Sequence, residues 1–369
     1  MAETQLASMR LGSVDVDEEK RKKSAPIIHI IDGQTDQMLD WITVGNVISN
    51  NHRKSLRDTL ETFDFETFAD KRFSEHLTDL NRVVIPDEDG TYVEFVIQQA
   101  GKFRDNEGLK MEVFTSASYL MLKKAKVIRP HSTGSETARQ HAELALDNTE
   151  WQVGEVVHTG YRTFHFDDYS DPYRYLKRIA SEFELELNFR VEIDSNRIIG
   201  RYVDLVERVG MWRGREVEFG KDLVGIRRVE RTDEVVTALV GVGPEREDGT
   251  RLEVFVEDID ALQRWGRNGQ HIIEVYEPQS TDANMTEARL RQLTEAELAK
   301  RVNAIVEYET EIIDLEHVPG LENKVIRFGD TIRIKDTKFN PPLYLEARIH
   351  TQDRDIIDKS RKTVTLGDY

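Results

Sequence analysis

The chain has 369 residues and no cysteine, and its 51 Lys+Arg against 69 Asp+Glu give a formal net charge of −18. A chain of this length corresponds to about one to three domains, and the lack of cysteine excludes disulfides, thiolate metal sites and cysteine nucleophiles. The acidic balance disfavours nucleic-acid binding, because holding phosphates requires clustered Lys and Arg.

Residues 1–26 are expected to form a flexible N-terminal tail. An acidic run ending at Glu19 is followed by the basic run Lys20–Lys23, and no apolar run is long enough for a signal peptide. No stretch of the sequence approaches the roughly 20 apolar residues of a membrane helix, so we expect no membrane segment.

Residues 27–130 have the alternating pattern of short β-strands separated by turns. Asp32-Gly33 is a turn dipeptide, and Pro86 presets the backbone at the start of a turn that ends at Gly90. The predicted strands are Ile27–Ile31, Arg82–Ile85, Thr91–Ile97 and Met111–Thr115. Strands at this spacing predict a first β-barrel-like domain.

A polar stretch, residues 131–149, is expected to be a linker, and residues 150–221 an α+β domain. Asp171 can cap a helix whose first residue is Pro172, and apolar residues then follow the helical period to Phe183. Two strands follow, Leu185–Val191 and Ile198–Leu205, joined by a turn at residues 194–196. The pattern predicts one helix lying over a hairpin.

Residues 222–369 are expected to form a second β-barrel-like domain with a helical insertion at about residues 276–305. The predicted strands are Ile226–Arg231, Val235–Val242, Leu252–Val256, Ile305–Leu315, Val325–Arg327, Thr331–Lys335, Leu343–Ile349 and Thr363–Leu366. Helices are predicted over Asp258–Trp265 and Met285–Ile305, and Thr294–Glu297 has the spacing of a capping box. The fold class is therefore α+β and mainly β.

A short internal similarity connects the two halves of the chain. Glu88–Glu94 and Glu247–Glu253 share five identities over seven residues. Common Asp-Gly hairpin turns explain this similarity, and a duplicated β-domain is the alternative.

The sequence offers little that predicts catalysis. It contains no Gly-x-Ser-x-Gly, His-Glu-x-x-His or phosphate-loop motif, and the dinucleotide-loop similarity of residues 241–244 is weak. His158, His165, Asp167 and Asp168 are metal ligands by type, but His158 and His165 would lie on opposite faces of one strand. We expect no metal and no cofactor, and we interpret the acidic residues 87–89 as turn residues.

Three glutamates in the last part of the chain are candidate channel-lining residues. Glu307, Glu309 and Glu311 alternate with other residues, so on a strand they share one face at separations of about 6.5 to 7 Å. Like charges in a row cannot face a dry core. They form either an ordinary solvated face or the wall of an acidic channel that DNA passes without binding.

Several stretches, in their order along the chain, resemble the phage tail hub proteins of the prophage endopeptidase tail family, also called tail-associated lysins or phage minor structural proteins. They are Ile30–Thr35, Leu60–Ala69, Asn81–Gly90, Ala117–Leu120, Ile179–Phe183, Gly214–Val217, Gly329–Ile332 and Phe339–Arg348. The resemblance runs from about Ile27 to Tyr369.

This resemblance implies a fold similar to the central hub of contractile baseplates, with two tube domains per chain and a homotrimer that forms a six-barrel ring. It implies a virion protein at the tail tip, which closes the tail tube and adapts its six-fold symmetry to a three-fold tip. The implied partners are a distal tail protein ring, the tape-measure protein, the tail tube, DNA in passage and, indirectly, the host cell wall.

We expect a structural protein and not an enzyme, with any lytic domain C-terminal to this chain. Two alternatives stay open. One is a cell-wall hydrolase, suggested by the family name and the cluster from His158 to Asp168. The other is a receptor-binding protein that uses aromatic side chains, although aromatic residues more often pack in a core. These aromatic residues are Trp151, Tyr161, Tyr169 and Tyr173.

Overall fold

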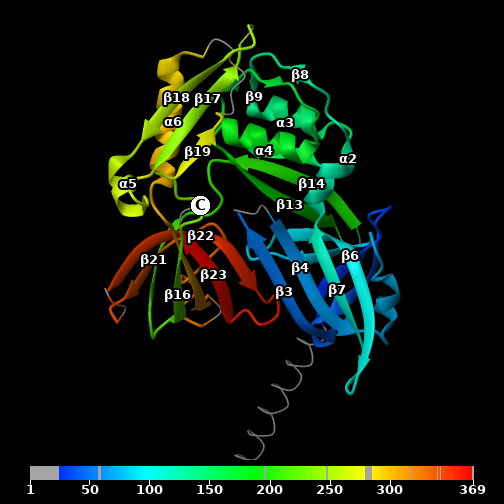
Figure 1. The fold of residues 1–369 in the computed structure, drawn as a ribbon. Coiled ribbons are helices and arrows are strands. Elements are labelled where there is room, and N and C mark those ends of the chain that lie inside the picture. Colours follow the sequence, from blue (N-terminus) through cyan, green and yellow to red (C-terminus); the bar gives the residue numbers. More distant parts are fainter. Residues whose placement is uncertain are drawn as a thin grey trace, which may run out of the picture. The chain divides into compact units, whose positions relative to one another are not determined.

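The computed structural model describes residues 25–56, 60–194, 197–246, 248–278, 285–316, 318–338, 340 and 342–367. The chain divides into two compact units (Figure 1). Unit 1 comprises Met1–Gly225 and Thr310–Thr365, and unit 2 comprises Ile226–Glu309 and Leu366–Tyr369. The protein is mainly β with few helices, which confirms the coarse fold class. The five predicted domain segments stay predictions, and residues 1–24 of the expected tail lie outside the described residues.

Unit 1 begins with a group of antiparallel strands. They are β1 (Pro26–Ile31), β2 (Met38–Thr43), β3 (Val47–Ser55), β4 (Leu60–Phe68), β5 (Arg82–Pro86), β6 (Tyr92–Asp105) and β7 (Gly108–Ala117). The strands predicted near β1, β5, β6 and β7 are confirmed. The Asp32 carboxylate accepts hydrogen bonds from the backbone of Gln34 and Thr35, which forms the predicted turn after β1. Alternate residues of β4, such as Phe63 and Phe65, are buried.

An α+β part follows in unit 1. Its elements are α2 (Leu122–Ala125), β8 (His131–Ser132), β9 (Glu136–Thr137), α3 (Ala138–Leu146), β10 (Gln152–Val156), β11 (Tyr161–Arg162), β12 (His165–Phe166), α4 (Pro172–Glu182), β13 (Glu186–Asp194) and β14 (Arg197–Val206). As predicted, Asp171 caps α4 by accepting a hydrogen bond from Arg174 N at 2.9 Å. The segment assigned to a linker contains α3, whose Ala138 and Ala142 are fully buried in the core. Residues 195–196 of the predicted turn lie outside the described residues.

The last strands complete the main sheet. They are β15 (Trp212–Glu218), β16 (Leu223–Arg231), β20 (Ile305–Ile313), β21 (Thr331–Asp336), β22 (Leu343–Arg354) and β23 (Arg361–Gly367). Hydrogen-bonded neighbours run in the order β10-β14-β13-β6-β7-β4-β3-β22-β23-β20-β16. The first half of β22 pairs with β21 and its second half pairs with β3. This strand therefore joins the N-terminal strands to the C-terminal ones.

The strand predicted over Val325–Arg327 is wrong. The carbonyl of Ile326 accepts a hydrogen bond from Lys362 Nζ at 2.9 Å, and Arg327 N donates to an Asp330 carboxylate oxygen at 2.9 Å. Side chains thus take the backbone groups that a strand would use for pairing.

Unit 2 contains a three-stranded sheet with helices. Its elements are β17 (Ala238–Glu245), β18 (Arg251–Glu257), α5 (Ile259–Trp265), β19 (Ile273–Tyr276) and α6 (Glu287–Arg301), and the strand order is β18-β17-β19. The predicted helices are confirmed, but α6 begins at the cap Thr286. The predicted cap at Thr294 is wrong, because Thr294 is fully buried within α6 and its hydroxyl donates to the Leu290 carbonyl. Residues 279–284 of the predicted insertion lie outside the described residues.

The two similar heptapeptides form similar hairpin turns. Asp87 N donates to Thr91 O and Arg246 N donates to Thr250 O, each at 2.8 Å. Gly90 has φ +77° and Gly249 has φ +79°, which glycine adopts readily. The two turns share this local chemistry, the duplicated β-domain stays an alternative, and Glu247 lies outside the described residues.

Candidate functional site

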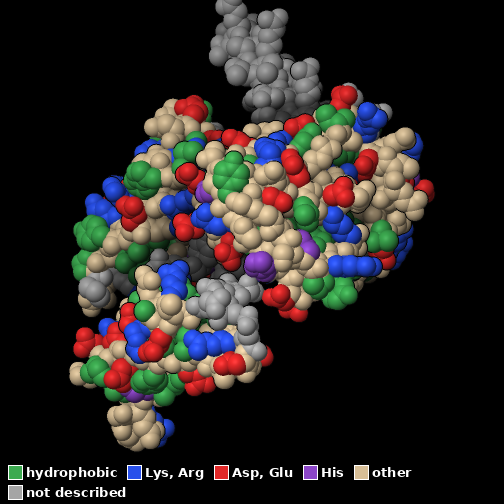
Figure 2. Space-filling view, turned by 90° about the horizontal axis from the view of Figure 1, so that it is seen from above, with side chains coloured by type: hydrophobic (Ala, Val, Ile, Leu, Met, Phe, Trp, Pro, Cys, Tyr) green, Lys and Arg blue, Asp and Glu red, His purple; other side chains and the backbone are tan. Residues whose placement is uncertain are grey.

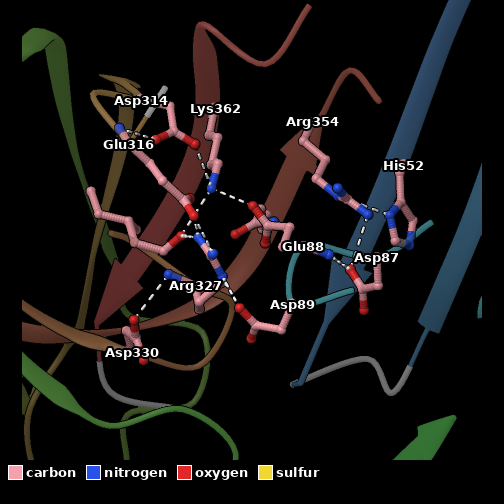
Figure 3. Close-up of polar contacts among 12 residues, drawn as sticks. His52, Asp87, Glu88, Asp89, Asp314, Glu316, Arg327, Asp330, Arg354 and Lys362 are labelled. Carbon is pink, nitrogen blue, oxygen red and sulfur yellow. Dashed lines mark hydrogen bonds and ion pairs between the residues drawn. The ribbon is translucent and has the colours of Figure 1, made fainter. Parts of the chain in front are cut away.

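The hairpin turn between β5 and β6 carries its acidic side chains into a network of ion pairs in unit 1 (Figure 3). Asp87 lies 2.6 Å from Lys54 Nζ and accepts a hydrogen bond from Arg354 at 3.0 Å. Burial alone would raise the pKa of Asp87, but the positive charges of Lys54 and Arg354 outweigh it and hold that pKa well below its usual range. The turn prediction is confirmed, and Asp87 also has a structural role that the turn prediction missed.

His52 extends the network into the core. It is 1% exposed, and its Nδ1 lies 3.0 Å from Arg354 Nε while its Nε2 lies 2.8 Å from a Glu61 oxygen. Since the guanidinium can only donate, Nδ1 must accept, and neutral His52 therefore carries its proton on Nε2 and donates it to Glu61. Burial lowers the pKa of His52, which favours this neutral form.

A second half of the network surrounds Glu88 and Arg327. Glu88 pairs with Lys362, which lies 2.8 Å from Asp314. Arg327 makes two hydrogen bonds to Glu316, at 2.5 and 2.7 Å, and lies 2.6 Å from Asp89. The side chains of Arg327 and Lys362 are 9% and 5% exposed. Buried charges with this many partners hold the β5–β6 turn against β22, β23 and the loop before β21.

These partners were not predicted from the sequence, although Lys362 and Arg354 each carry a signal of a buried partner. Lys362 shares the buried face of β23 with Val364 and Leu366, so a charged side chain stands where an apolar one is expected. Arg354 is likewise buried at the end of β22. An inward-pointing charge in a strand indicates a buried partner but does not identify it.

The three candidate glutamates lie on β20, and the boundary between the units falls after Glu309. Tyr308, Thr310 and Ile312 are buried, whereas the three glutamates occupy the other, more exposed face. Within unit 2, Arg231 lies 3.8 Å from Glu307 and Arg227 lies 3.7 Å from Glu309. The arginines of β16 offset part of the negative charge, and the channel-lining role stays a prediction.

The acidic excess is not gathered into one area on the side of the molecule shown in Figure 2. Asp and Glu side chains there are interspersed with Lys and Arg, and hydrophobic side chains occur between them. Four further acids, Asp87, Glu88, Asp314 and Glu316, are paired with cations in the network of unit 1. A net charge of −18 therefore does not by itself produce an acidic wall.

The cluster from His158 to Asp168 is not assembled into a site. The predicted single strand is divided: His158 precedes β11, and His165 lies in β12, where its Nδ1 lies 2.8 Å from the Ser132 hydroxyl oxygen. His158 packs edge-on against Phe183. In the part of the chain that the structure describes, no three His, Asp or Glu side chains are grouped as a metal site requires.

The four candidate aromatic residues divide between core and surface. Trp151 and Tyr173 are buried in the core of unit 1, as aromatic residues usually are. Tyr161 and Tyr169 are exposed. None of the helices in the described ranges has the length and apolar character that a membrane span requires.

Comparison with known proteins confirms the predicted resemblance. Residues 212–369 match the family model described as prophage endopeptidase tail. A search of curated protein sequences found no match.

Three solved structures share the fold over nearly their full length. The prophage tail protein gp18 from Listeria monocytogenes EGD-e has a TM-score of 0.57 and 13% identity, covering 94% of this chain and 95% of that one. The tail protein from Neisseria meningitidis MC58 has a TM-score of 0.61 and 9% identity, covering 93% and 96%. The 43 kDa tail protein of prophage MuSo2 from Shewanella oneidensis has a TM-score of 0.61 and 13% identity, covering 93% and 98%.

Proposed function

We propose that this chain, whose residues 212–369 match the prophage endopeptidase tail family and whose fold is that of phage tail proteins, is a structural component of a phage tail. The observation that carries the proposal is that the fold similarity spans nearly the whole of three tail proteins. A chain that matches such proteins end to end is more simply a tail subunit than a domain of an unrelated enzyme.

The finer proposal is a homotrimeric hub at the tail tip that closes the tail tube, adapts six-fold to three-fold symmetry and surrounds the DNA passage. Its proposed partners are a distal tail protein ring and the tape-measure protein. The buried network is compatible with a scaffold role, because its ion pairs connect the β5–β6 turn to β22, β23 and the loop before β21.

Electron microscopy of purified tails tests the location and the symmetry. We expect three-fold density for this chain at the tail tip, viewed down the axis, and no tip assembly in particles made without the chain. Normal tips in such particles would refute the structural role. A clearing band in a zymogram of the purified chain would instead support the hydrolase alternative.

The channel proposal has its own test. If Glu307, Glu309 and Glu311 face DNA, replacing all three by Lys slows DNA ejection, because the new cations attract the phosphates. The matched control is a variant with the same change in charge at three other exposed positions, Glu75→Lys/Glu143→Lys/Glu295→Lys. Unchanged ejection in the triple variant would refute the channel-lining role and leave the hub assignment intact.

A further inference from the structure

The three-stranded sheet of unit 2 has an apolar face that the described residues leave open. On β19, Ile273 is 51% exposed and Val275 is 62% exposed, and on β18 Phe255 is 46% exposed. The register places Val275 beside Val240 of β17, and Val240 opposite Phe255. These residues therefore form one row across all three strands. With Val242 and Ile273 they make up what we call the open face.

The opposite face of the same sheet is already covered. Leu239 and Val256, which alternate with the open-face residues along β17 and β18, pack in one cluster with Leu298 of α6. Val254 packs in a second buried cluster with Leu290 of α6. Figure 1 shows α6 beside β17 and β18. A sheet that is apolar on both faces is normally covered on both, and here one cover is missing from the described residues.

We propose that the open face of unit 2 binds an amphipathic helix of a partner protein, whose apolar side is flanked by Lys or Arg. This proposal goes beyond the tail-subunit role and does not depend on the trimer. The width of the face favours a helix over an added strand. β18 and β19 are two strand spacings apart, about 10 Å, which one helix of about 10 Å diameter spans. A strand added beside β19 could not reach Phe255.

The charges beside the open face favour a partner that carries positive charge, because Arg251, the cation on this side of β18, is already paired with Glu277 at 2.9 Å. Glu253 and Glu257 flank Phe255 on β18, point to the same side of the sheet and are exposed. Glu257 also lies 2.9 Å from His271, whose ring meets Phe255 edge-on. Cationic side chains along one edge of the bound helix would satisfy these carboxylates, whereas acidic ones would be repelled.

The test uses the full chain and a fluorescent synthetic peptide of about 14 residues, with Leu at helical spacing and Lys elsewhere. We expect saturable binding of this peptide. The dissociation constant should rise at least about tenfold for a peptide with Glu in place of Lys, and also for a peptide whose Leu residues occupy every second position, as a strand would require. We expect a similar loss for the Val275→Glu variant. Because an added carboxylate would strengthen a merely electrostatic attraction, that loss reports the apolar contact.

Val127→Glu is the matched control, since Val127 is an exposed valine of unit 1, and it should bind the peptide as the unchanged chain does. Equal binding by the Val275→Glu variant, or by the acidic peptide, would overturn the proposal. If the unchanged chain binds no peptide but self-associates, and Val275→Glu abolishes that self-association, the face binds a second copy of the chain. That result would also overturn the proposal.

A thiol probe tests whether the chain covers the face itself. The sequence has no cysteine, so Val275→Cys introduces a single thiol. We expect a maleimide to label the thiol of the Val275→Cys variant as fast as the thiol of a Val127→Cys variant, since Val127 is exposed. Addition of the Leu/Lys peptide should slow the labelling of Val275→Cys at least about tenfold. Slow labelling in the free chain, similar to that of Val254→Cys in the core, would refute an open face.

Discussion

Replacing Arg354 by Met removes the central cation of the buried network while keeping most of the side-chain volume. Arg354 is 6% exposed and donates to Asp87 at 3.0 Å, to the Pro86 carbonyl at 3.3 Å and to His52 Nδ1 at 3.0 Å. Breaking a buried charge pair by removing one partner costs about 3 to 5 kcal/mol. Because Lys54 still neutralises Asp87, we expect the lower end, a loss of about 3 kcal/mol in the free energy of unfolding.

An exposed ion pair between β3 and β22, the strands that carry His52 and Arg354, provides the control. Arg53 of β3 lies 3.1 Å from Asp353 of β22, with side chains that are 44% and 24% exposed. Exposed pairs contribute about 0 to 1 kcal/mol, so Arg53→Met should cost no more than about 1 kcal/mol.

Urea unfolding followed by tryptophan fluorescence measures both losses. In a Trp265→Phe background the remaining tryptophans, at positions 41, 151 and 212, all lie in unit 1. Equal losses for Arg354→Met and Arg53→Met would refute the argument that burial makes the network costly to break. In the double variant Asp87→Asn/Arg354→Met the losses should not add, because both changes remove the same ion pair.

Three further predictions concern pH, a helix cap and a close contact. The pKa of His52 is lowered in the folded chain, so the unfolded chain binds more protons and stability falls as pH drops below about 6.5, by up to about 1.4 kcal/mol per unit. His52→Gln should flatten this slope in unfolding curves between pH 7.5 and 5, and an unchanged slope would contradict the assignment. Asp171→Ala removes the α4 cap and should lower the free energy of unfolding by about 1 kcal/mol in urea titrations, while Asp171→Asn should cost less. Gly241→Ala would place a Cβ 2.0 Å from Thr294 Oγ1 and should lower the melting temperature of unit 2. Adding Thr294→Ala to this variant should recover part of the loss. An unchanged melting temperature in the Gly241→Ala variant would contradict the contact.

Local chemistry made part of the fold predictable. The β5–β6 hairpin and α4 were predicted because their signals, a Pro and Asp-Gly turn and an Asp-Pro start, lie within a few residues of the structure that they specify. The prediction over Val325–Arg327 failed partly for a non-local reason, since Lys362 binds the Ile326 carbonyl from 36 residues away, whereas Asp330, which binds Arg327 N, is close in sequence. Propensity alone contains no information about such partners.

The candidate site was predictable only in part. The alternation of β20 follows from the sequence and gives its glutamates a shared face, but their offsetting arginines come from β16, some 80 residues earlier in the chain. Asp87 and Arg354 are 267 residues apart. Neither composition nor spacing indicates that these two side chains meet, so the turn acids were assigned only to the turn.

The network also selects the register of β22 on β3. The register pairs Arg354 with His52 and Asp353 with Arg53, so alternate residues of β22 point into the network and away from it. A slip by one residue would turn Arg354 outward and Asp353 inward. Asp87 would then lose Arg354, one of its two cations, and the Asp353 carboxylate would be buried beside it. Burying an unpaired charge costs free energy. We infer that these buried charges, besides contributing to stability, favour a single register of β22 on β3.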